Sequence, residues 1–279
     1  KVLITGGAGF IGSHLVEFYL NNNVEVIVLD NFSTGRIENL NQFKDDPNLS
    51  IFECDISKDN LENYFDNIDY VFHLAALADI VPSIEDPLSY FNANVVGTLN
   101  LMQSIKSSKI KKIIYAASSS CYGIPNQYPT NEDAPINPQY PYAFTKNIGE
   151  QLIKHWSKIY NIPYVSLRFF NVYGTRSRTS GTYGAVFGVF LAQKLAKKPF
   201  TVVGDGKQKR DFTYVTDVVE AINKSAISVC ENEVFNIGSD NTYSINELIA
   251  LLGGKSNFIP KRPGEPDCTW ADISKAKKI

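Results

Sequence analysis

The sequence predicts an α/β fold, in which a doubly wound, mostly parallel sheet is followed by a smaller C-terminal α/β lobe. In the first two-thirds of the chain, short apolar runs alternate with amphipathic stretches, which is the pattern of repeated βαβ units. After Arg168 this alternation breaks, and short strands mix with helices and glycine-rich turns. With 279 residues, the chain is long enough to bury one or two cores.

The predicted strands are short, rich in valine, isoleucine and leucine, and apolar on both faces, as buried parallel strands should be. In chain order they are Val2–Thr5, Val24–Asp30, Ser50–Glu53, Tyr70–Leu74, Lys112–Ala116 and Tyr164–Phe169. Helices are predicted between and after them, at Phe10–Leu20, Leu61–Phe65, Pro87–Ser107, Tyr142–Tyr160, Ala185–Lys197, Thr216–Ser228 and Ser244–Leu251. The glycine-, serine- and arginine-rich stretch from Gly174 to Gly184 is predicted to be a loop.

Composition excludes several classes of function. The net charge of −2 offers no case for nucleic acid or acidic membranes as partners. No stretch of 18 apolar residues predicts a membrane span, and the opening apolar run is too short for a signal peptide. The four scattered cysteines lack a CxxC spacing, so we expect no disulfide framework and no metal site, but reduced thiols in a cytoplasmic protein. Both ends look trimmed, and we expect further sequence beyond them.

A glycine-rich turn follows the first predicted strand. Gly6, Gly9 and Gly12 form a G-x-x-G-x-x-G pattern where that strand meets the first helix. Glycine permits a tight turn, close approach of the backbone to a pyrophosphate and close helix packing. The helix that starts at Phe10 and Ile11 would present free N–H groups and its positive dipole end to the phosphates. The pattern therefore predicts a dinucleotide-binding Rossmann domain.

An acidic residue stands where the dinucleotide ribose is expected. Asp30 ends the second predicted strand, 18 residues after Gly12, and Asn31 follows it. A carboxylate there can accept hydrogen bonds from both ribose hydroxyls and would repel a 2′-phosphate, which favours NAD over NADP. Asp55 and Ile56, after the third strand, are candidates for the adenine end, and a plain turn would explain them nearly as well.

A second motif predicts proton transfer. Tyr142 and Lys146 are four residues apart in a predicted helix and therefore share one face. Free tyrosine, with a pKa near ~10, is a poor base at neutral pH, but a neighbouring ammonium lowers that pKa. A phenolate tuned in this way can take a hydroxyl proton as hydride leaves the same carbon. Ser118, after the fifth strand, can relay the proton or hold the substrate oxygen.

These motifs divide the chain into two predicted parts. The NAD-binding Rossmann domain comprises residues 1–171, with 205–230 returning to it. The substrate-binding lobe comprises residues 172–204 and 231–279.

At these residues the chain resembles the extended short-chain dehydrogenase/reductase superfamily, and within it the NAD-dependent nucleotide-sugar epimerases and dehydratases. The resemblance covers nearly the whole chain. Beyond the two motifs it includes His73–Ala76, Asn94–Thr98, Ser118–Gly123, Arg168–Asn171, Arg210–Phe212, Arg262–Glu265 and Trp270–Asp272.

The resemblance implies roles for particular residues. Those expected to contact the cofactor, beyond the glycine turn and the acidic residues, are Leu74, Ala75, Ala76, Asn94, Tyr142 and Lys146. Those expected to contact a nucleotide-sugar substrate are Ser118, Ser119, Ser120, Asn171, Arg210, Arg262 and Thr269, with the asparagine and the arginines on the diphosphate. Relatives are usually homodimers that pair the helices predicted at Pro87–Ser107 and Tyr142–Tyr160.

The residues after Ser118 favour one reaction. Related 4,6-dehydratases carry an Asp-Glu pair where Ser119 and Ser120 stand, and related decarboxylases carry Glu in place of Ser120. The serine run resembles that of UDP-glucose and UDP-N-acetylglucosamine 4-epimerases. We therefore expect transient oxidation at C4 of the sugar, through a 4-keto intermediate and without a metal. Dehydration, net reduction, and a non-catalytic NAD-binding sensor on the same fold remain the alternatives.

The identity of the sugar and of the nucleotide base is predicted less closely than the reaction. Thr269 stands where some galactose epimerases have a bulky tyrosine, which suggests room for an N-acetylhexosamine, a uronate or another substituted sugar. Val203 and Val186 replace an aromatic residue and an asparagine of many relatives, so UDP is favoured while CDP and GDP stay open.

Overall fold

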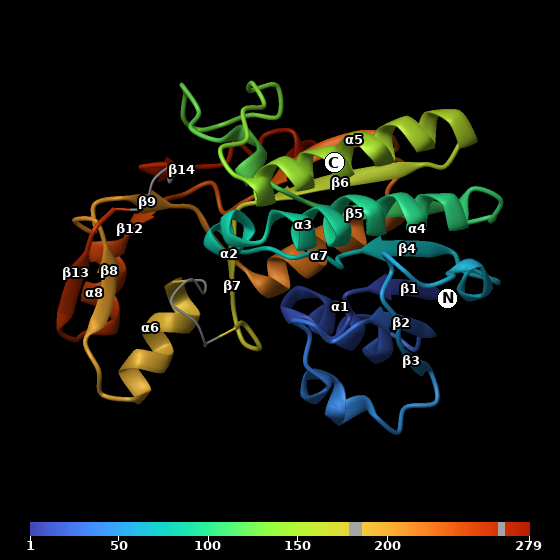
Figure 1. Cartoon of the computed structure of the whole chain (residues 1–279), viewed down its shortest axis with the longest axis horizontal. Coiled ribbons are helices and arrows are strands. Elements are labelled where there is room, and N and C mark those ends of the chain that lie inside the picture. Colours follow the sequence, from blue (N-terminus) through green and yellow to red (C-terminus); the bar gives the residue numbers. More distant parts are fainter. Residues whose placement is uncertain (179–185, 262–265) are drawn as a thin grey trace.

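The computed structural model describes residues 1–178, 186–261 and 266–279. Its centre is a seven-stranded sheet in the order β11-β6-β5-β4-β1-β2-β3, with every neighbouring pair parallel. The predicted doubly wound α/β fold is therefore confirmed (Figure 1). The strands are β1 Val2–Thr5, β2 Val26–Asp30, β3 Leu49–Glu53, β4 Tyr70–His73, β5 Lys112–Ser118, β6 Tyr164–Phe169 and β11 Glu233–Ile237.

Successive residues of the central strands enter two different cores, because side chains alternate across a sheet. Leu3 packs in one core with Leu101, whereas Ile4 packs in the other with Leu15. The core that contains Leu3 is closed by α4 Gly97–Ile105 and α5 Pro141–Tyr160, and the other by α1 Phe10–Asn21 and α7 Val215–Ile227. The strands are thus buried on both faces, which explains their nearly continuous apolar sequence.

Within residues 61–107, the helical regions differ from the predictions in three places. The helix predicted over Pro87–Ser107 is interrupted: α3 Pro87–Phe91 and α4 are joined by a π-helical turn, η3 Asn92–Val96. Residues 61–65 form only a single 3₁₀ turn, η2 Glu62–Tyr64, because so short a segment does not sustain an α-helix. A short helix, α2 Ile80–Glu85, was not predicted, since six residues with an internal proline show no helical period.

The lobe is smaller than the sequence predicts. Residues 233–237 form β11 at the edge of the central sheet beside β6, although the predicted lobe included 231–279. A five-residue apolar strand does not reveal which sheet it joins, because that choice depends on contacts distant in sequence. The lobe itself pairs β8 Phe200–Val203 with β13 Ser256–Ile259 and packs α6 Val186–Leu195 and α8 Ile245–Leu252 around a separate core.

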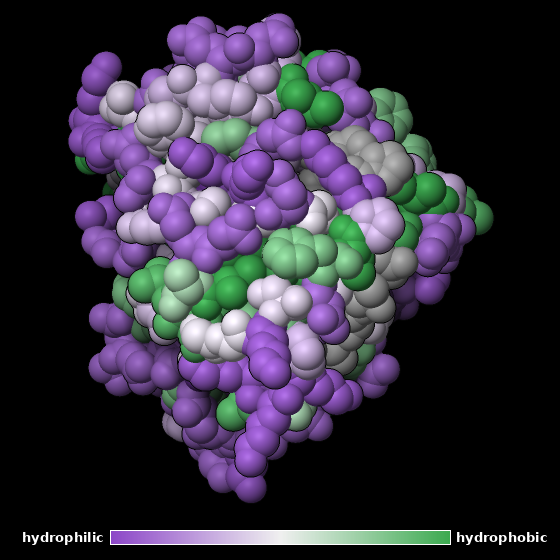
Figure 2. All heavy atoms as spheres, turned by 90° about the vertical axis from the view of Figure 1, so that its left-hand side faces the viewer, coloured by the Kyte–Doolittle hydropathy of each residue, from purple (hydrophilic) through white to green (hydrophobic). Residues whose placement is uncertain are grey.

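Short strands connect the lobe to the main sheet (Figure 1). β7 Asn171–Tyr173 pairs with β10 Phe212–Tyr214, and β9 Lys209–Arg210 lies between β12 Tyr243–Ser244 and β14 Cys268–Thr269. On the lobe-side face, hydrophilic residues cover most of the surface and hydrophobic residues gather across its middle (Figure 2). None of the helices in the described ranges has the length and apolar character that a membrane crossing requires.

Candidate active site

A cavity of about 620 Å³ lies where the carboxyl ends of the central strands meet the lobe. The strand order reverses between β1 and β4, and in open α/β sheets ligands bind at this switch point. Residues after β1, β2, β4 and β5 line the cavity on the sheet side. Residues of β7, β9, β14 and α6 line it on the lobe side.

Most residues predicted from the sequence line this one cavity. They are Gly6, Gly9, Phe10, Ile11, Gly12, Asp30, Asn31, Asp55, Ile56, Leu74, Ala75, Ala76, Ser118, Ser119, Ser120, Tyr142, Asn171, Arg210 and Thr269. Asn94 and Lys146 do not line it but are buried beside it. Arg262 lies outside the described residues.

The glycine turn after β1 leaves no room for side chains. Gly6 has φ +72°, and a Cβ there would lie 2.7 Å from the Ala75 backbone nitrogen. A Cβ at Gly12 would lie 2.1 Å from the Gly6 carbonyl oxygen. Gly9 precedes α1 without a side-chain cap, and the first helical turn contains no acidic residue. The N–H groups and dipole of α1 are thus open toward the cavity, which fits a dinucleotide phosphate.

Asp30 lies at the end of β2, 7% exposed, with both carboxylate oxygens oriented by the backbone. The Ala8 N–H donates to Oδ2 and the Phe32 N–H donates to Oδ1, each at 2.9 Å. Burial raises the pKa of Asp30, while these two hydrogen bonds lower it. Each oxygen retains a further lone pair, so the carboxylate can still accept a ribose hydroxyl.

Tyr142 is in the first turn of α5, and its hydroxyl meets the serine run at the end of β5. Ser118 is hydrogen-bonded to Ser120 through their hydroxyls at 2.8 Å. Burial raises the pKa of Tyr142, and hydrogen bonds from the Ser118 and Ser120 side chains lower it. Ser120 therefore contacts the Tyr142 hydroxyl together with Ser118, although the sequence predicts Ser120 only as a substrate contact.

Lys146 follows Tyr142 by one turn of α5 and is 4% exposed. Its ammonium nitrogen lies 4.3 Å from the centre of the Tyr115 ring, a cation–π contact. The Tyr115 hydroxyl donates to the Lys146 carbonyl at 3.3 Å. Gly149 leaves room for this hydroxyl, since a Cβ at that position would lie only 2.4 Å from the hydroxyl oxygen. Burial lowers the pKa of Lys146 to about 7, while Glu150 raises it. Because this pKa is close to neutral, the fraction of Lys146 that is protonated depends on the balance between burial and the Glu150 carboxylate.

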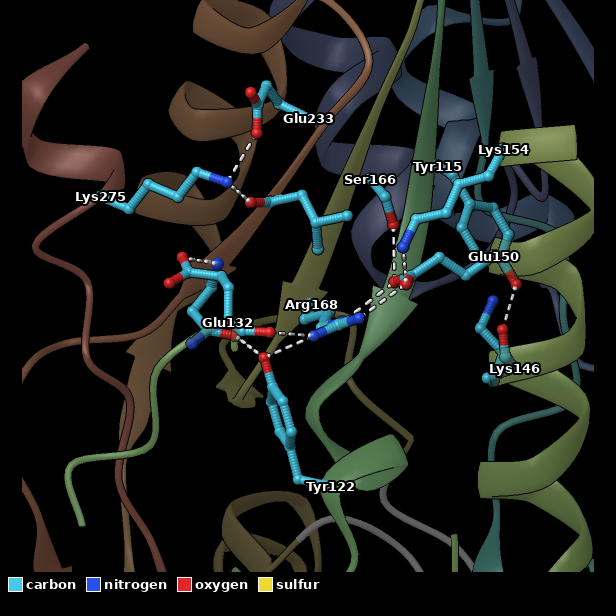
Figure 3. A network of polar contacts seen from close by, with 12 residues as sticks. Tyr115, Tyr122, Glu132, Lys146, Glu150, Lys154, Ser166, Arg168, Glu233 and Lys275 are labelled. Atoms are coloured by element: carbon cyan, nitrogen blue, oxygen red, sulfur yellow. Dashed lines mark hydrogen bonds and ion pairs between the residues drawn. The ribbon is translucent and has the colours of Figure 1, made fainter. Parts of the chain in front are cut away.

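Glu150, one turn beyond Lys146, anchors a buried polar network (Figure 3). Arg168 of β6 donates to both of its carboxylate oxygens, at 3.0 and 2.7 Å, and the Ser166 hydroxyl donates at 3.0 Å. Arg168 also donates to the Tyr122 hydroxyl at 2.8 Å. Burial acts to raise the pKa of Glu150, but Arg168 and Lys154 bring it below its usual value. The carboxylate therefore stays charged one turn from Lys146.

A second network orients the loop after β4. The His73 ring lies between the hydroxyls of Thr5 and Thr98, 2.8 Å from each. Because Thr98 donates its own proton to the Asn94 carbonyl, His73 must donate to Thr98 through Nε2 and accept from Thr5 through Nδ1. Burial, with a smaller contribution from Lys146, lowers the pKa of His73 to about 3, which suits this neutral tautomer.

The Asn94 side chain extends the same network to the cavity wall. Its carbonyl oxygen accepts from the Leu77 N–H at 2.8 Å, and its amide donates to the Leu77 carbonyl at 3.0 Å. Asn94 therefore supports the backbone of a residue that lines the cavity, and does not itself reach the cavity.

On the lobe side, two predicted substrate residues contact each other. The Thr269 hydroxyl of β14 donates to Asn171 Oδ1 of β7 at 2.7 Å. Asp211, fully buried beside Arg210, accepts from the N–H groups of Ser239 and Ala271 and so fixes the strands that carry this wall. β7, β9 and β14 are thereby held in one arrangement around the cavity.

Charged residues that were not predicted from the sequence also line the cavity. Asp79 and Arg178 form an ion pair at 2.7 Å, from the segments before α2 and after β7, and Arg176 lies nearby. The arginine-rich composition of the predicted loop after Gly174 was the available signal. It did not place these side chains, because a loop conformation is set by tertiary contacts.

The chain is similar to known proteins over nearly its whole length. The chain matches the profile of the NAD dependent epimerase/dehydratase family over residues 2–238. It is 37% identical to the UDP-N-acetylglucosamine 4-epimerase from Methanobrevibacter ruminantium M1, solved in complex with UDP-N-acetylmuramic acid, with a TM-score of 0.95 and coverage of 100% of this chain and 91% of that one. It is 35% identical to the UDP-glucuronic acid 4-epimerase from Bacillus cereus, solved in complex with UDP-glucuronic acid and NAD, with a TM-score of 0.93 and coverage of 100% and 92%.

A UDP-glucose 4-epimerase of Mycolicibacterium smegmatis is 32% identical over 288 residues, covering 100% of this chain and 92% of that protein. The resemblance and the cofactor predicted from the two motifs are thus confirmed, since NAD dependence is a defining property of the matched family. The family profile matches most of the chain, and the chain covers these relatives almost completely. The chain therefore belongs to the NAD-dependent epimerase/dehydratase family.

Proposed function

We propose that the protein is a 4-epimerase of a UDP-sugar that acts through a transient 4-keto intermediate. The observation that carries the proposal is the meeting of the Tyr142 phenol with Ser118 and Ser120 in the cavity that also contains the glycine turn. The activities named for the relatives, on UDP-glucose, UDP-N-acetylglucosamine and UDP-glucuronate, support it.

The proposed chemistry follows from the side chains. NAD⁺, held by the glycine turn and Asp30, would supply reversible hydride transfer at C4 of the sugar. Tyr142 takes the proton of the 4-hydroxyl and gives it back when the keto group is reduced. Ser118 and Ser120 hydrogen-bond the phenol oxygen and stabilise its ionised form. Lys146, one turn further along α5, is proposed to add the charge of its ammonium.

Two further features bear on the outcome. Inversion requires the 4-keto sugar to turn about its diphosphate, for which Asn171 and Arg210 are the proposed anchors on the lobe side. A dehydratase would need an additional acid and base, but serines follow Ser118, and the cavity carboxylate that acts on Tyr142, Asp79, is paired with Arg178. Epimerisation is therefore favoured over dehydration.

Proton NMR of the protein with NAD⁺ and UDP-, CDP- and GDP-sugars in D₂O tests the proposal. We expect a C4 epimer that carries no deuterium in the sugar, because hydride returns directly. Deuterium uptake with a 4-keto-6-deoxy product would instead mean dehydration. Stoichiometric NADH release or NAD(P)H consumption would mean net redox chemistry, and no change with any sugar would favour the sensor.

The size of the sugar pocket gives a first prediction. We propose that Thr269 leaves room for an N-acetylated or otherwise substituted sugar, and Thr269→Tyr is expected to fill that room. Turnover of the UDP-N-acetylhexosamine should fall about 5- to 150-fold relative to the UDP-hexose, as expected for a clash of roughly 1–3 kcal/mol.

Thr269→Val is the matched control, because it keeps the size of Thr269 but removes its hydrogen bond to Asn171. It should leave the ratio of the two turnovers nearly unchanged. If Thr269→Tyr also leaves that ratio unchanged, Thr269 does not limit the pocket.

We also propose a homodimer that pairs the segment predicted as a helix at Pro87–Ser107, which comprises α3, η3 and α4, with α5. Large apolar side chains are exposed on these helices, including Leu88 at 68% and Phe144 at 54%, beside a depression of about 420 Å³ bordered by Phe91 and Phe144. A second copy of the chain would bury this surface.

A cytoplasmic location is also proposed, because the four cysteines are free thiols.

Sedimentation analysis checks the dimer. Phe144→Glu is expected to shift the protein from dimer to monomer, because an unpaired carboxylate would be buried in the interface. Leu251→Glu makes a comparable change at an exposed position of the lobe and should leave the dimer intact. A wild-type protein that sediments as a monomer would contradict the pairing.

A further inference from the structure

The loop after β7 is fastened to the helix that follows the glycine turn. One ring nitrogen of His14 lies 3.0 Å from the Thr175 carbonyl oxygen, and Arg176 forms an ion pair with Glu17 at 2.5 Å. Both partners of the loop are on α1, the helix whose N-terminus opens toward the cavity. Arg176 itself lines the cavity together with Phe10 and Ile11 of that helix.

The Arg176 guanidinium is only partly satisfied by this contact. One of its terminal nitrogens binds Glu17, whereas the other, NH1, is buried and has no hydrogen-bond partner among the described residues. Buried polar groups are almost always hydrogen-bonded, and a charged donor without a partner is costly to keep. Arg176 also has φ +62°, a left-handed conformation that non-glycine residues rarely adopt. A missing anionic ligand would account for both features.

We infer that Arg176 is a further cofactor-binding residue, whose guanidinium holds the diphosphate of NAD beside the N-terminus of α1. A diphosphate carries two negative charges and offers acceptors that match the fork of a guanidinium. The glycine turn supplies only backbone N–H groups and a partial charge there. Arg176 adds a guanidinium, and because Glu17 binds only one of its terminal nitrogens, the other is left to donate to a phosphate oxygen.

The substrate also carries a diphosphate, but the contacts favour the cofactor as the ligand. Arg176 is tied to α1 through Glu17, and its neighbour Thr175 is tied to α1 through His14. The proposed anchors of the substrate diphosphate, Asn171 and Arg210, are on β7 and β9 instead. Arg176 is therefore assigned to the cofactor diphosphate, and Asn171 and Arg210 remain with the substrate.

Calorimetric titration of the protein, freed of bound nucleotide, with NAD⁺ and with UDP tests this inference. Arg176→Gln is expected to weaken NAD⁺ binding about tenfold or more, the loss that a charge-assisted hydrogen bond implies. UDP binding should stay nearly unchanged, and the dependence of NAD⁺ affinity on salt should become shallower. Arg176→Lys, which keeps the charge, should recover part of the affinity.

Lys224→Gln is the control for loss of one positive charge, since Lys224 is in an exposed ion pair with Glu220 on α7. It should leave NAD⁺ affinity unchanged. Unchanged NAD⁺ affinity in Arg176→Gln, or a loss confined to UDP, would overturn the assignment. An equal loss for both ligands would also overturn it, because Arg176 would then act through the general shape of the cavity.

Discussion

Tyr142→Phe is expected to lower turnover by about 10²–10⁴-fold, the usual contribution of a positioned acid–base group. The change removes one hydroxyl from a half-buried ring that lines the cavity, and it leaves Lys146 and the glycine turn in place. NAD⁺ affinity and thermal stability should therefore stay close to those of the wild type. Steady-state kinetics together with an NAD⁺ titration separate these effects.

Tyr160→Phe is the matched control, because it makes the same change at the exposed far end of the same helix. It should have no effect on turnover. Near-normal turnover in Tyr142→Phe would remove Tyr142 from the mechanism and would leave Ser118 as the remaining candidate.

Arg168→Met is expected to lower the free energy of unfolding by about 3–5 kcal/mol, because it leaves the buried Glu150 carboxylate without its main partner. The side chains of Arg168 and Glu150 are only 4% and 3% exposed, so water cannot replace the lost contact. Urea denaturation of the wild type and the variant measures the loss.

Two further variants sharpen this prediction. Lys154→Met removes the half-buried partner of Glu150 and should cost less than about 1 kcal/mol. A double variant, Glu150→Met with Arg168→Met, should be more stable than Arg168→Met alone, because no unpaired charge is then buried. A loss for Arg168→Met no larger than that for Lys154→Met would show that the pair contributes little.

The Glu150–Arg168 pair also affects the active site, because Glu150 acts on the charge of Lys146. Tyr142, Lys146 and Glu150 follow one another at four-residue intervals on one face of α5. Glu150 raises the pKa of Lys146 against the effect of burial, so the network supports the charged lysine that the proposed chemistry uses. Tyr115 contributes the other support, through its ring and its hydroxyl.

Local patterns predicted the elements that carry the cofactor. β1 and β6 have the predicted bounds, and the glycine turn lies between β1 and α1 as its spacing requires. Such features can be predicted because a buried strand, a turn with positive φ and a helix start each impose their residue types on a few consecutive positions. Asp30 could be placed in the same way, since it ends a strand next to that turn.

Contacts between residues distant in sequence could not be predicted in this way. The sequence did not indicate that β11 joins the central sheet, that Thr269 binds Asn171, or that the α1 helix holds the loop with Arg176. Each of these contacts joins residues at least 68 positions apart (233−165 = 68), and none leaves a periodic pattern in the chain.

The α/β class, the dinucleotide turn and the Tyr142–Lys146 pair could be predicted from the chain alone, because each follows from residues that are close together in sequence. The contact of the serine run with Tyr142, the position of Glu150, paired with Arg168, near Lys146, and the lobe residues that close the cavity became known only from the folded structure. Charge and hydrogen bonding in a buried site depend on neighbours that folding brings together from distant parts of the sequence.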